Sequence, residues 1–125
     1  MNGYVYQKMT FSEINKVLEN CYICVLGMCC NDMPYQVPMY FTYDRFHGEP
    51  KFILESKQTS QKIDILKSKP DVSLFIQFNE PDEYKSVLVS GRAKLTNMDN
   101  SCSHSNMVSI VIEATELTGR VYRKK

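Results

Sequence analysis

Hydroxyl groups and one lysine gather where a predicted strand passes into a predicted helix. Ser56 ends an extended run, and Thr59 and Ser60 follow at the start of a short helical segment. Lys62 falls in the first turn of that segment. A helix start presents unpaired N–H groups and partial positive charge, so these side chains complete a set of donors that suits a phosphate monoester. An ordinary capped surface helix with a solvated lysine is the alternative that these residues leave open.

A second candidate is the run Val37-Pro38-Met39-Tyr40, which lies inside a predicted strand. Proline has no backbone N–H and interrupts a hydrogen-bonded ladder. We therefore expect Pro38 at a sheet edge, at a bulge, or at a gap where backbone groups face a ligand.

Cysteine and histidine provide no persuasive metal or redox site. Cys21 and Cys24 have Cys-x-x-Cys spacing, but residues three apart on a strand point to opposite faces, so buried hydrophobic cysteines are the better interpretation. His47 and His104 fall in predicted loops and lack the compact spacing of a zinc site. We predict no metal site and assign no catalytic residue.

The composition is that of one soluble domain spanning residues 1–125. A formal net charge of +1 gives no case for nucleic acid binding, and no apolar run is long enough to span a membrane. Five cysteines, an odd number, and a first segment without an apolar secretory core favour the cytoplasm. The basic end formed by Arg120, Arg123, Lys124 and Lys125 is expected to be a solvated tail.

Periodicity predicts six strands and two short helices. A capping box at Thr10 and Glu13 opens a helix over residues 11–20, and a second helix runs from Thr59 or Ser60 to about Lys67. Gly91 is a predicted bend or bulge. The remaining elements are strands at 22–30, 35–43, 51–55, 71–78, 84–95 and 107–114, a polar loop at 97–106, and a turn at 116–119. Without βαβ alternation, this pattern favours a closed or nearly closed antiparallel barrel.

The order of two strands, Ser56, Ser60-Gln61-Lys62, a helix and a further strand resembles the flavin-binding split barrels related to pyridoxamine-phosphate oxidase. Their nitroimidazole-reductase-like branch is the most similar. The resemblance covers residues 11–93 and resumes at 108–119, where the chain looks like the family's final strand. It implies a mainly β, six-stranded antiparallel split barrel, Greek-key-like, with two to three short helices.

The same resemblance implies where a flavin mononucleotide (FMN) would bind. Its phosphate would lie at Ser56 and at Ser60-Gln61-Lys62, and its ring along Val37-Pro38-Met39-Tyr40. Gln61 replaces a family arginine, which removes a contact of order 1.5–3 kcal/mol unless Arg45 or Arg92 approaches, and Glu55 stands where this branch often has histidine. Tyr84-Lys85-Ser86-Val87 resembles a family segment whose serine touches flavin from a neighbouring subunit, so Ser86 and Val87 join the predicted site and a homodimer is implied.

The resulting hypothesis is a cytoplasmic FMN-dependent oxidoreductase that passes electrons between a donor such as NAD(P)H and a small organic substrate. The cofactor carries this chemistry, and the protein orients it. The alternative is a non-enzymatic binding module on the same barrel, holding haem, another phosphorylated ligand or a protein partner. A structural dimer without any ligand is a third possibility.

Overall fold

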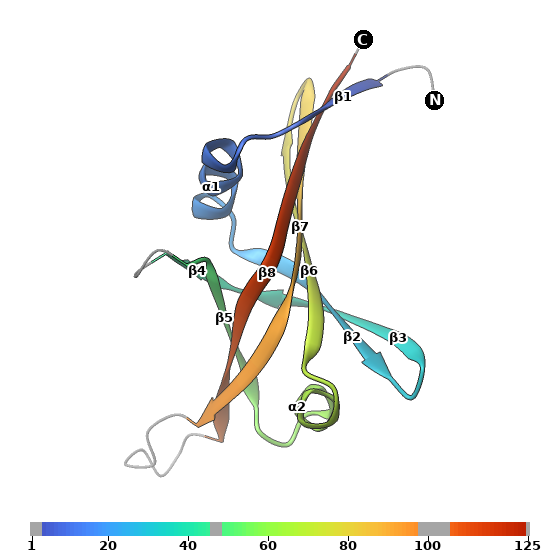
Figure 1. The fold of residues 1–125 in the computed structure, drawn as a ribbon, viewed down its shortest axis with the longest axis vertical. Coiled ribbons are helices and arrows are strands. Elements are labelled where there is room, and N and C mark those ends of the chain that lie inside the picture. Colours follow the sequence, from blue (N-terminus) through green and yellow to red (C-terminus); the bar gives the residue numbers. More distant parts are fainter. Residues whose placement is uncertain (1–3, 46–48, 98–105, 125) are drawn as a thin grey trace.

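The computed structural model describes residues 4–45, 49–97 and 106–124. They form an eight-stranded antiparallel sheet that curls around a buried interior, with two short helices packed against it (Figure 1). The hydrogen-bonded order is β3-β2-β6-β7-β8-β5-β4, and β1 pairs with β8. The helices are α1 (Phe11–Glu19) and α2 (Gln61–Ser68). The strands are β1 (Tyr4–Lys8), β2 (Ile23–Cys30), β3 (Met33–Tyr40), β4 (Thr42–Asp44), β5 (Lys51–Lys57), β6 (Asp71–Glu80), β7 (Glu83–Asn97) and β8 (Met107–Lys124).

The predicted split-barrel architecture is confirmed, but the strand count is eight rather than six. The first additional strand is β1, whose five residues are all exposed and therefore carry no alternating pattern. The second arises because the predicted strand over 35–43 divides at Phe41. The N–H of Phe41 donates to the Tyr22 carbonyl at 2.9 Å, and β4 then pairs with β5 while β3 pairs with β2. Of the three positions expected for Pro38, the sheet edge is the one observed, because β3 is the first strand of the order.

Strand β8 does not end at Ala114, so the predicted turn over residues 116–119 is wrong. Gly91 pairs with Ala114 and Ser90 pairs with Glu116, which leaves Thr115 as the extra residue of a β-bulge. The predicted irregularity at Gly91 is therefore confirmed. A Cβ atom at this glycine would lie 2.5 Å from the Glu113 carbonyl oxygen, so the strands can approach this closely only without a side chain.

The bulge changes which side chains of β8 point inward. Ile110 and Ile112 are buried before it, whereas Gly119 and Val121 are buried after it, so even-numbered residues exchange places with odd-numbered ones. This loss of a constant two-residue period explains why the sequence pattern suggested a turn here.

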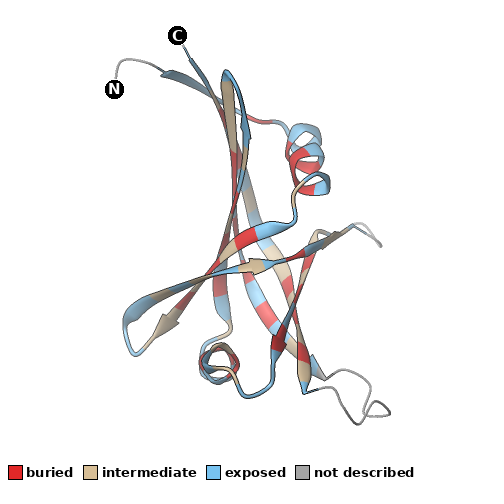
Figure 2. Cartoon of the chain, turned by 180° about the vertical axis from the view of Figure 1, so that it is seen from behind, coloured by how far each residue is buried: buried red, intermediate tan, exposed pale blue. Residues whose placement is uncertain are grey.

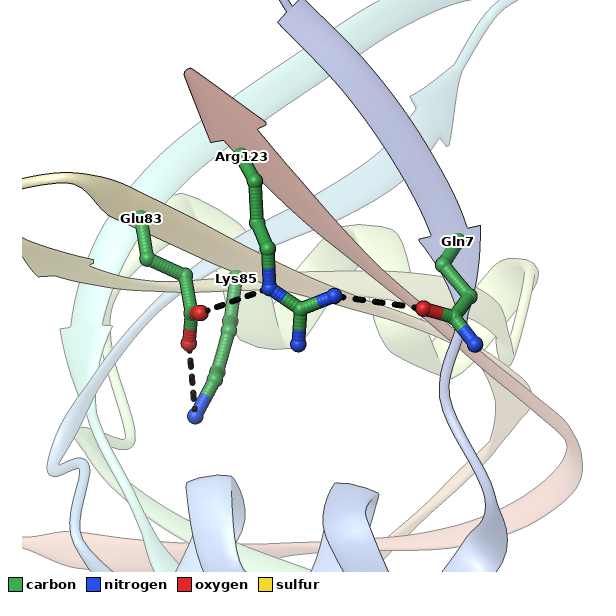
Figure 3. Close-up of polar contacts among 4 residues, drawn as sticks. All are labelled: Gln7, Glu83, Lys85 and Arg123. Carbon is green, nitrogen blue, oxygen red and sulfur yellow. Dashed lines mark hydrogen bonds and ion pairs between the residues drawn. The ribbon is translucent and has the colours of Figure 1, made fainter. Parts of the chain in front are cut away.

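The basic end of the described chain is part of the sheet, which corrects the expectation of a solvated tail; Lys125 lies outside the described residues. Arg123 donates from Nε to a Glu83 carboxylate oxygen at 3.0 Å and from a terminal nitrogen to the Gln7 side-chain oxygen at 3.2 Å (Figure 3). Lys85 contacts the other Glu83 oxygen at 3.3 Å. Hydrogen bonds from Arg123 and Lys85 hold the pKa of Glu83 below its ordinary value. These contacts join β1, β7 and β8.

Helix α1 forms as predicted, apart from its last residue. The Thr10 hydroxyl accepts from the Glu13 N–H, and the Glu13 carboxylate accepts from the Thr10 N–H at 2.9 Å, which completes the capping box. Ile14, Val17 and Leu18 are buried, so the apolar face of α1 covers one end of the interior. Figure 2 shows the buried residues concentrated on the facing sides of the helices and on alternating positions of the central strands.

Helix α2 begins after Ser60, one of the two predicted caps, and buries Ile63, Ile65 and Leu66. Ser60 makes no side-chain hydrogen bond to the helix. His47 and His104 lie outside the described residues, as does most of the predicted loop at 97–106. Within the described ranges, neither helix is long and apolar enough to cross a membrane.

Candidate functional site

A hollow of about 510 Å³ lies between the β3–β4 bend, β5 and α2. We call it the corner hollow. Its lining residues are Pro38, Met39, Tyr40, Phe41, Thr42, Ile53, Glu55 and Lys62. The structure therefore brings five of the predicted site residues together from three separate segments.

On the β3 side of the corner hollow, successive side chains of this edge strand point alternately outward and toward the interior. Pro38 and Tyr40 point outward and are exposed, and Tyr40 has 73% of its surface accessible. Val37 points toward the interior and is packed against the core, so its side chain does not line the hollow. Pro38 and Tyr40 thus contribute two ring-bearing side chains to the lining, and a planar ligand can pack against such rings.

The β5–α2 corner supplies the polar side. Ser56 is buried, and its hydroxyl lies 2.8 Å from that of Ser60 and donates to the Lys57 carbonyl at 3.2 Å. Lys62 and Glu55 both line the corner hollow, so it contains one cation and one carboxylate. An anion bound here would be attracted by Lys62 and repelled by Glu55.

Gln61 lies outside the corner hollow. It lines a different depression, of about 590 Å³, between α2 and the β2–β3 turn. Neither arginine considered as a replacement cation reaches the corner: Arg92 pairs with Asp71 at 3.6 Å, and Arg45 lies over the Phe11 ring at 5.3 Å. Among the described residues, Lys62 is therefore the only positively charged side chain that lines the corner hollow.

Ser86 and Val87 are not part of the corner hollow either. Val87 is fully buried in the core. Ser86 points to the outer face of the sheet and is only 8% exposed. It lines a smaller hollow of about 210 Å³, which we call the Ser86 hollow. The other lining residues are Phe75, Tyr84, Leu88, Thr118, Gly119, Arg120 and Tyr122.

Sequence reasoning missed Phe41, Thr42 and Ile53 in the corner hollow, and Arg120 and the tyrosines of the Ser86 hollow. The bend at Phe41 had no signal beyond the nearby proline. Arg120 was assigned to a tail because the extension of β8 was not recognised.

The cysteines are free thiols wherever the structure describes them, at Cys21, Cys24, Cys29 and Cys30. Burial raises the pKa of the Cys24 thiol to about 12, and burial also raises that of Cys21. A thiol with a raised pKa is a poor nucleophile. This agrees with the interpretation of Cys24 as a small hydrophobic residue.

The fold is a split barrel. At Phe41 the chain passes from β3, which pairs with β2, to β4, which pairs with β5, so these two segments form the two ends of the strand order. The model of the pyridoxamine 5'-phosphate oxidase family matches residues 11–120, and this chain belongs to that family. No curated protein matches the chain.

Solved structures share this fold at low sequence identity. A FAD-binding protein from Mesorhizobium loti superposes with a TM-score of 0.80 at 20% identity, covering 94% of this chain and 98% of the other. A putative 5-nitroimidazole antibiotic resistance protein from Bacteroides thetaiotaomicron has a TM-score of 0.82 at 15% identity, with 98% and 91% covered. The FAD-binding protein from Mycobacterium smegmatis has a TM-score of 0.78 at 13% identity, with 95% and 100% covered.

Proposed function

We propose that this protein is a homodimeric, FMN-dependent oxidoreductase that binds its flavin in the corner hollow. The observation that carries the proposal is the meeting of Pro38 and Tyr40 with Lys62 around one hollow. The first two residues belong to the strand expected to lie along the flavin ring, and the third to the turn expected to hold the phosphate. A volume of about 510 Å³ is within the range of ligand sites.

The donors at the α2 start fit a phosphate group. Lys62 would supply the charge, and the first N–H groups of α2 would point toward the bound oxygens. The Ser56 hydroxyl has one proton, so rotating it from the Lys57 carbonyl to Ser60 would leave the Ser60 proton available to an anion without moving any heavier atom. Buried Ser56 would then position Ser60 rather than contact the phosphate itself.

Flavin supplies the redox chemistry in such a site by accepting and releasing a hydride equivalent. The chain's own residues would bind, orient and shield it. None of the described side chains lining the corner hollow is paired in a way that indicates an acid–base catalyst, so no protein group is assigned to proton transfer. Two neighbours in fold are named FAD-binding proteins, which supports a flavin as the ligand class.

Homodimer formation is part of the proposal because an exposed apolar patch adjoins the corner hollow. It consists of the exposed Tyr22, Ile23, Tyr40 and Leu88 together with the half-buried Val25 and Phe75. Tyr22 stacks on Tyr40 at 6.1 Å between ring centroids, and Tyr40 is paired with Ile23. Val25 is paired with Phe75 on β6, and Phe75 is paired with Leu88 on β7. The patch therefore continues across β6 to Leu88, which is 54% exposed. Such contiguous exposed surface marks interaction sites, and a second copy would close the open side of the hollow.

The electron donor that we propose is NAD(P)H, and the acceptor is a small organic molecule. Free thiols in the described chain support a reducing compartment, so we place this reaction in the cytoplasm.

The proposal is tested by the absorbance spectrum of the purified protein and by FMN titration. Replacing Lys62 with Ala should weaken FMN binding by about tenfold, because it removes a charge-assisted contact. Lys67→Ala is the matched control, since Lys67 is an exposed lysine in the last turn of the same helix. A protein that binds no flavin, or binds it equally well in both variants, would refute the site. Sedimentation should give twice the chain mass.

Glu55 favours one competing function, a binding module without turnover, because its carboxylate opposes a dianionic phosphate in the same hollow. The two functions differ in their response to NADPH. Bleaching of bound flavin under anaerobic conditions, followed by reoxidation in air, supports the enzyme. Stable binding without bleaching supports the module.

A further inference from the structure

The Ser86 hollow exists because a small residue lies among large ones on the outer face of the sheet. Ser86 pairs with Arg120 across β7 and β8. Two residues along in one direction Tyr84 pairs with Tyr122, and in the other Leu88 pairs with Thr118. Large side chains thus stand on both sides of a serine, and the gap between them is about 210 Å³.

Ser86 provides an unused polar group at the floor of this hollow. Its residue surface is 92% covered, being 8% exposed, and its hydroxyl makes no hydrogen bond within the described part of the chain, where no fully buried side-chain oxygen or nitrogen lacks a partner. The Ser86 hydroxyl is therefore reached by solvent through the hollow, and it can form a hydrogen bond with a ligand bound there.

Arg120 provides an uncompensated charge at the edge of the same hollow. No carboxylate pairs with it among the described residues. Four other cations of β7 and β8 are ion-paired: Lys85 and Arg123 with Glu83, Arg92 with Asp71, and Lys94 with Glu113. Its guanidinium lies over the Tyr6 ring at 5.0 Å, and the side-chain hydrogen bond to Tyr122 raises its pKa. Aromatic contacts on one face hold the planar group in place while its N–H donors remain able to bind an anion.

The side chains that form the walls of the Ser86 hollow indicate what kind of ligand could fill it. Tyr84 and Tyr122 lie 5.0 Å apart between ring centroids on one side, and Leu88 and Phe75 are paired on the other. Aromatic and aliphatic walls favour a flat apolar body, and a guanidinium fork favours a carboxylate. The volume is about that of seven waters at roughly 30 Å³ each, which limits the ligand to one small ring.

We propose that the Ser86 hollow binds a small aromatic carboxylate. The ring lies between the tyrosine pair and Leu88, the carboxylate binds Arg120, and the Ser86 hydroxyl donates to it. This hollow borders the apolar patch through Phe75 and Leu88, so in the homodimer it opens toward the interface. Its role as the seat of the organic substrate rests on the proposed function; the binding itself does not.

The experiment is a calorimetric titration of flavin-free protein with sodium benzoate. Benzamide has the ring without the charge, and propionate has the charge without the ring, so both should bind at least about tenfold more weakly than benzoate. Arg120→Gln should weaken benzoate binding by about tenfold or more, and Arg120→Lys by less, because lysine keeps the charge without the fork. Arg92→Gln is the matched control, since Arg92 is an exposed arginine of β7 that pairs with Asp71.

Benzoate affinity that is unchanged in Arg120→Gln, or equal to that of benzamide, would overturn the proposal, as would the absence of any benzoate binding. Ser86→Val fills the floor of the hollow and should abolish binding, while Ser86→Ala keeps the space and should weaken it several-fold through the lost hydrogen bond. Thermal melting checks that each variant is folded. Flavin absorbance is read separately, so a protein that binds benzoate but no flavin refutes only the proposed function.

Discussion

The two hollows of this protein differ in how their charges are balanced. In the corner hollow Lys62 faces the same space as Glu55, whereas in the Ser86 hollow none of the described lining residues beside Arg120 is a carboxylate. The larger hollow therefore offers a dianion little net charge, and the smaller one offers a monoanion a full charge. Volume alone would rank them in the opposite order, so we expect charge compensation, rather than volume, to decide which hollow holds an anion more tightly for its size.

Arg123 is an ion-paired arginine on the same strand. It lies three residues from Arg120, on the opposite face of β8, and it binds Glu83 and Gln7 (Figure 3). Two of its donors bind protein groups on β7 and β1, so it stabilises a strand junction. The contrast separates arginines that hold the sheet together from one that is available to a ligand.

Placing a carboxylate in the Ser86 hollow should remove the difference in charge balance between the two hollows, and it has the largest expected effect. Thr118→Glu places an acid two residues from Arg120 on the same face, as Glu55 accompanies Lys62. We expect benzoate affinity to fall by more than about tenfold, because the new acid pairs with the guanidinium and repels the ligand. Calorimetry measures the loss. Thr118→Gln has the same shape without the charge and should retain most of the affinity; an equal loss in both variants would assign the effect to shape.

The opposite change sharpens the comparison at the corner hollow. Glu55→Gln removes the repelling carboxylate, and FMN affinity should rise by about fivefold, which corresponds to roughly 1 kcal/mol between unit charges in a watery site. The gain should shrink in high salt, because the residue is exposed. Glu116→Gln alters an exposed glutamate elsewhere on the sheet and should leave affinity unchanged. A glutamine variant that binds FMN less tightly would mean that Glu55 contacts the ligand favourably.

The smallest expected effect concerns the compensated arginine. The pKa of Glu83 is below its ordinary 4.5 in the folded chain, so its stabilising contribution is complete above that value and is lost as pH falls through the folded pKa. Glu83→Gln should therefore flatten the decline in stability between about pH 5 and about pH 3. Urea unfolding at several pH values measures the slope. Parallel pH curves for both proteins would contradict this account of the network.

The elements that sequence could predict are those whose pattern is local. The capping box at Thr10 and the passage from Ser56 to Lys62 are complete within a few residues, and both formed where expected. Strand β1 has no buried face, and its only partner lies at the far end of the chain, so nothing local marks it.

The two hollows also differ in how far they could be predicted from local sequence patterns. Half of the corner hollow follows from short runs on β3 and α2, which a family resemblance can align. The Ser86 hollow depends on the register of three strands, and that register shifts at Thr115. Arg120 cannot be placed beside Ser86 until the bulge is known, and a bulge residue carries no local pattern of its own.

Thr115 also has a consequence for how this chain can change in length. Because one supernumerary residue sets the phase of everything that follows it in β8, deleting it would turn Gly119 and Val121 to the solvent and send Thr118 and Arg120 into the apolar interior. A single-codon deletion here should therefore be far more damaging than any exchange of side chain at the same place. At this position we expect β8 to accept a different side chain but not a change in the number of residues.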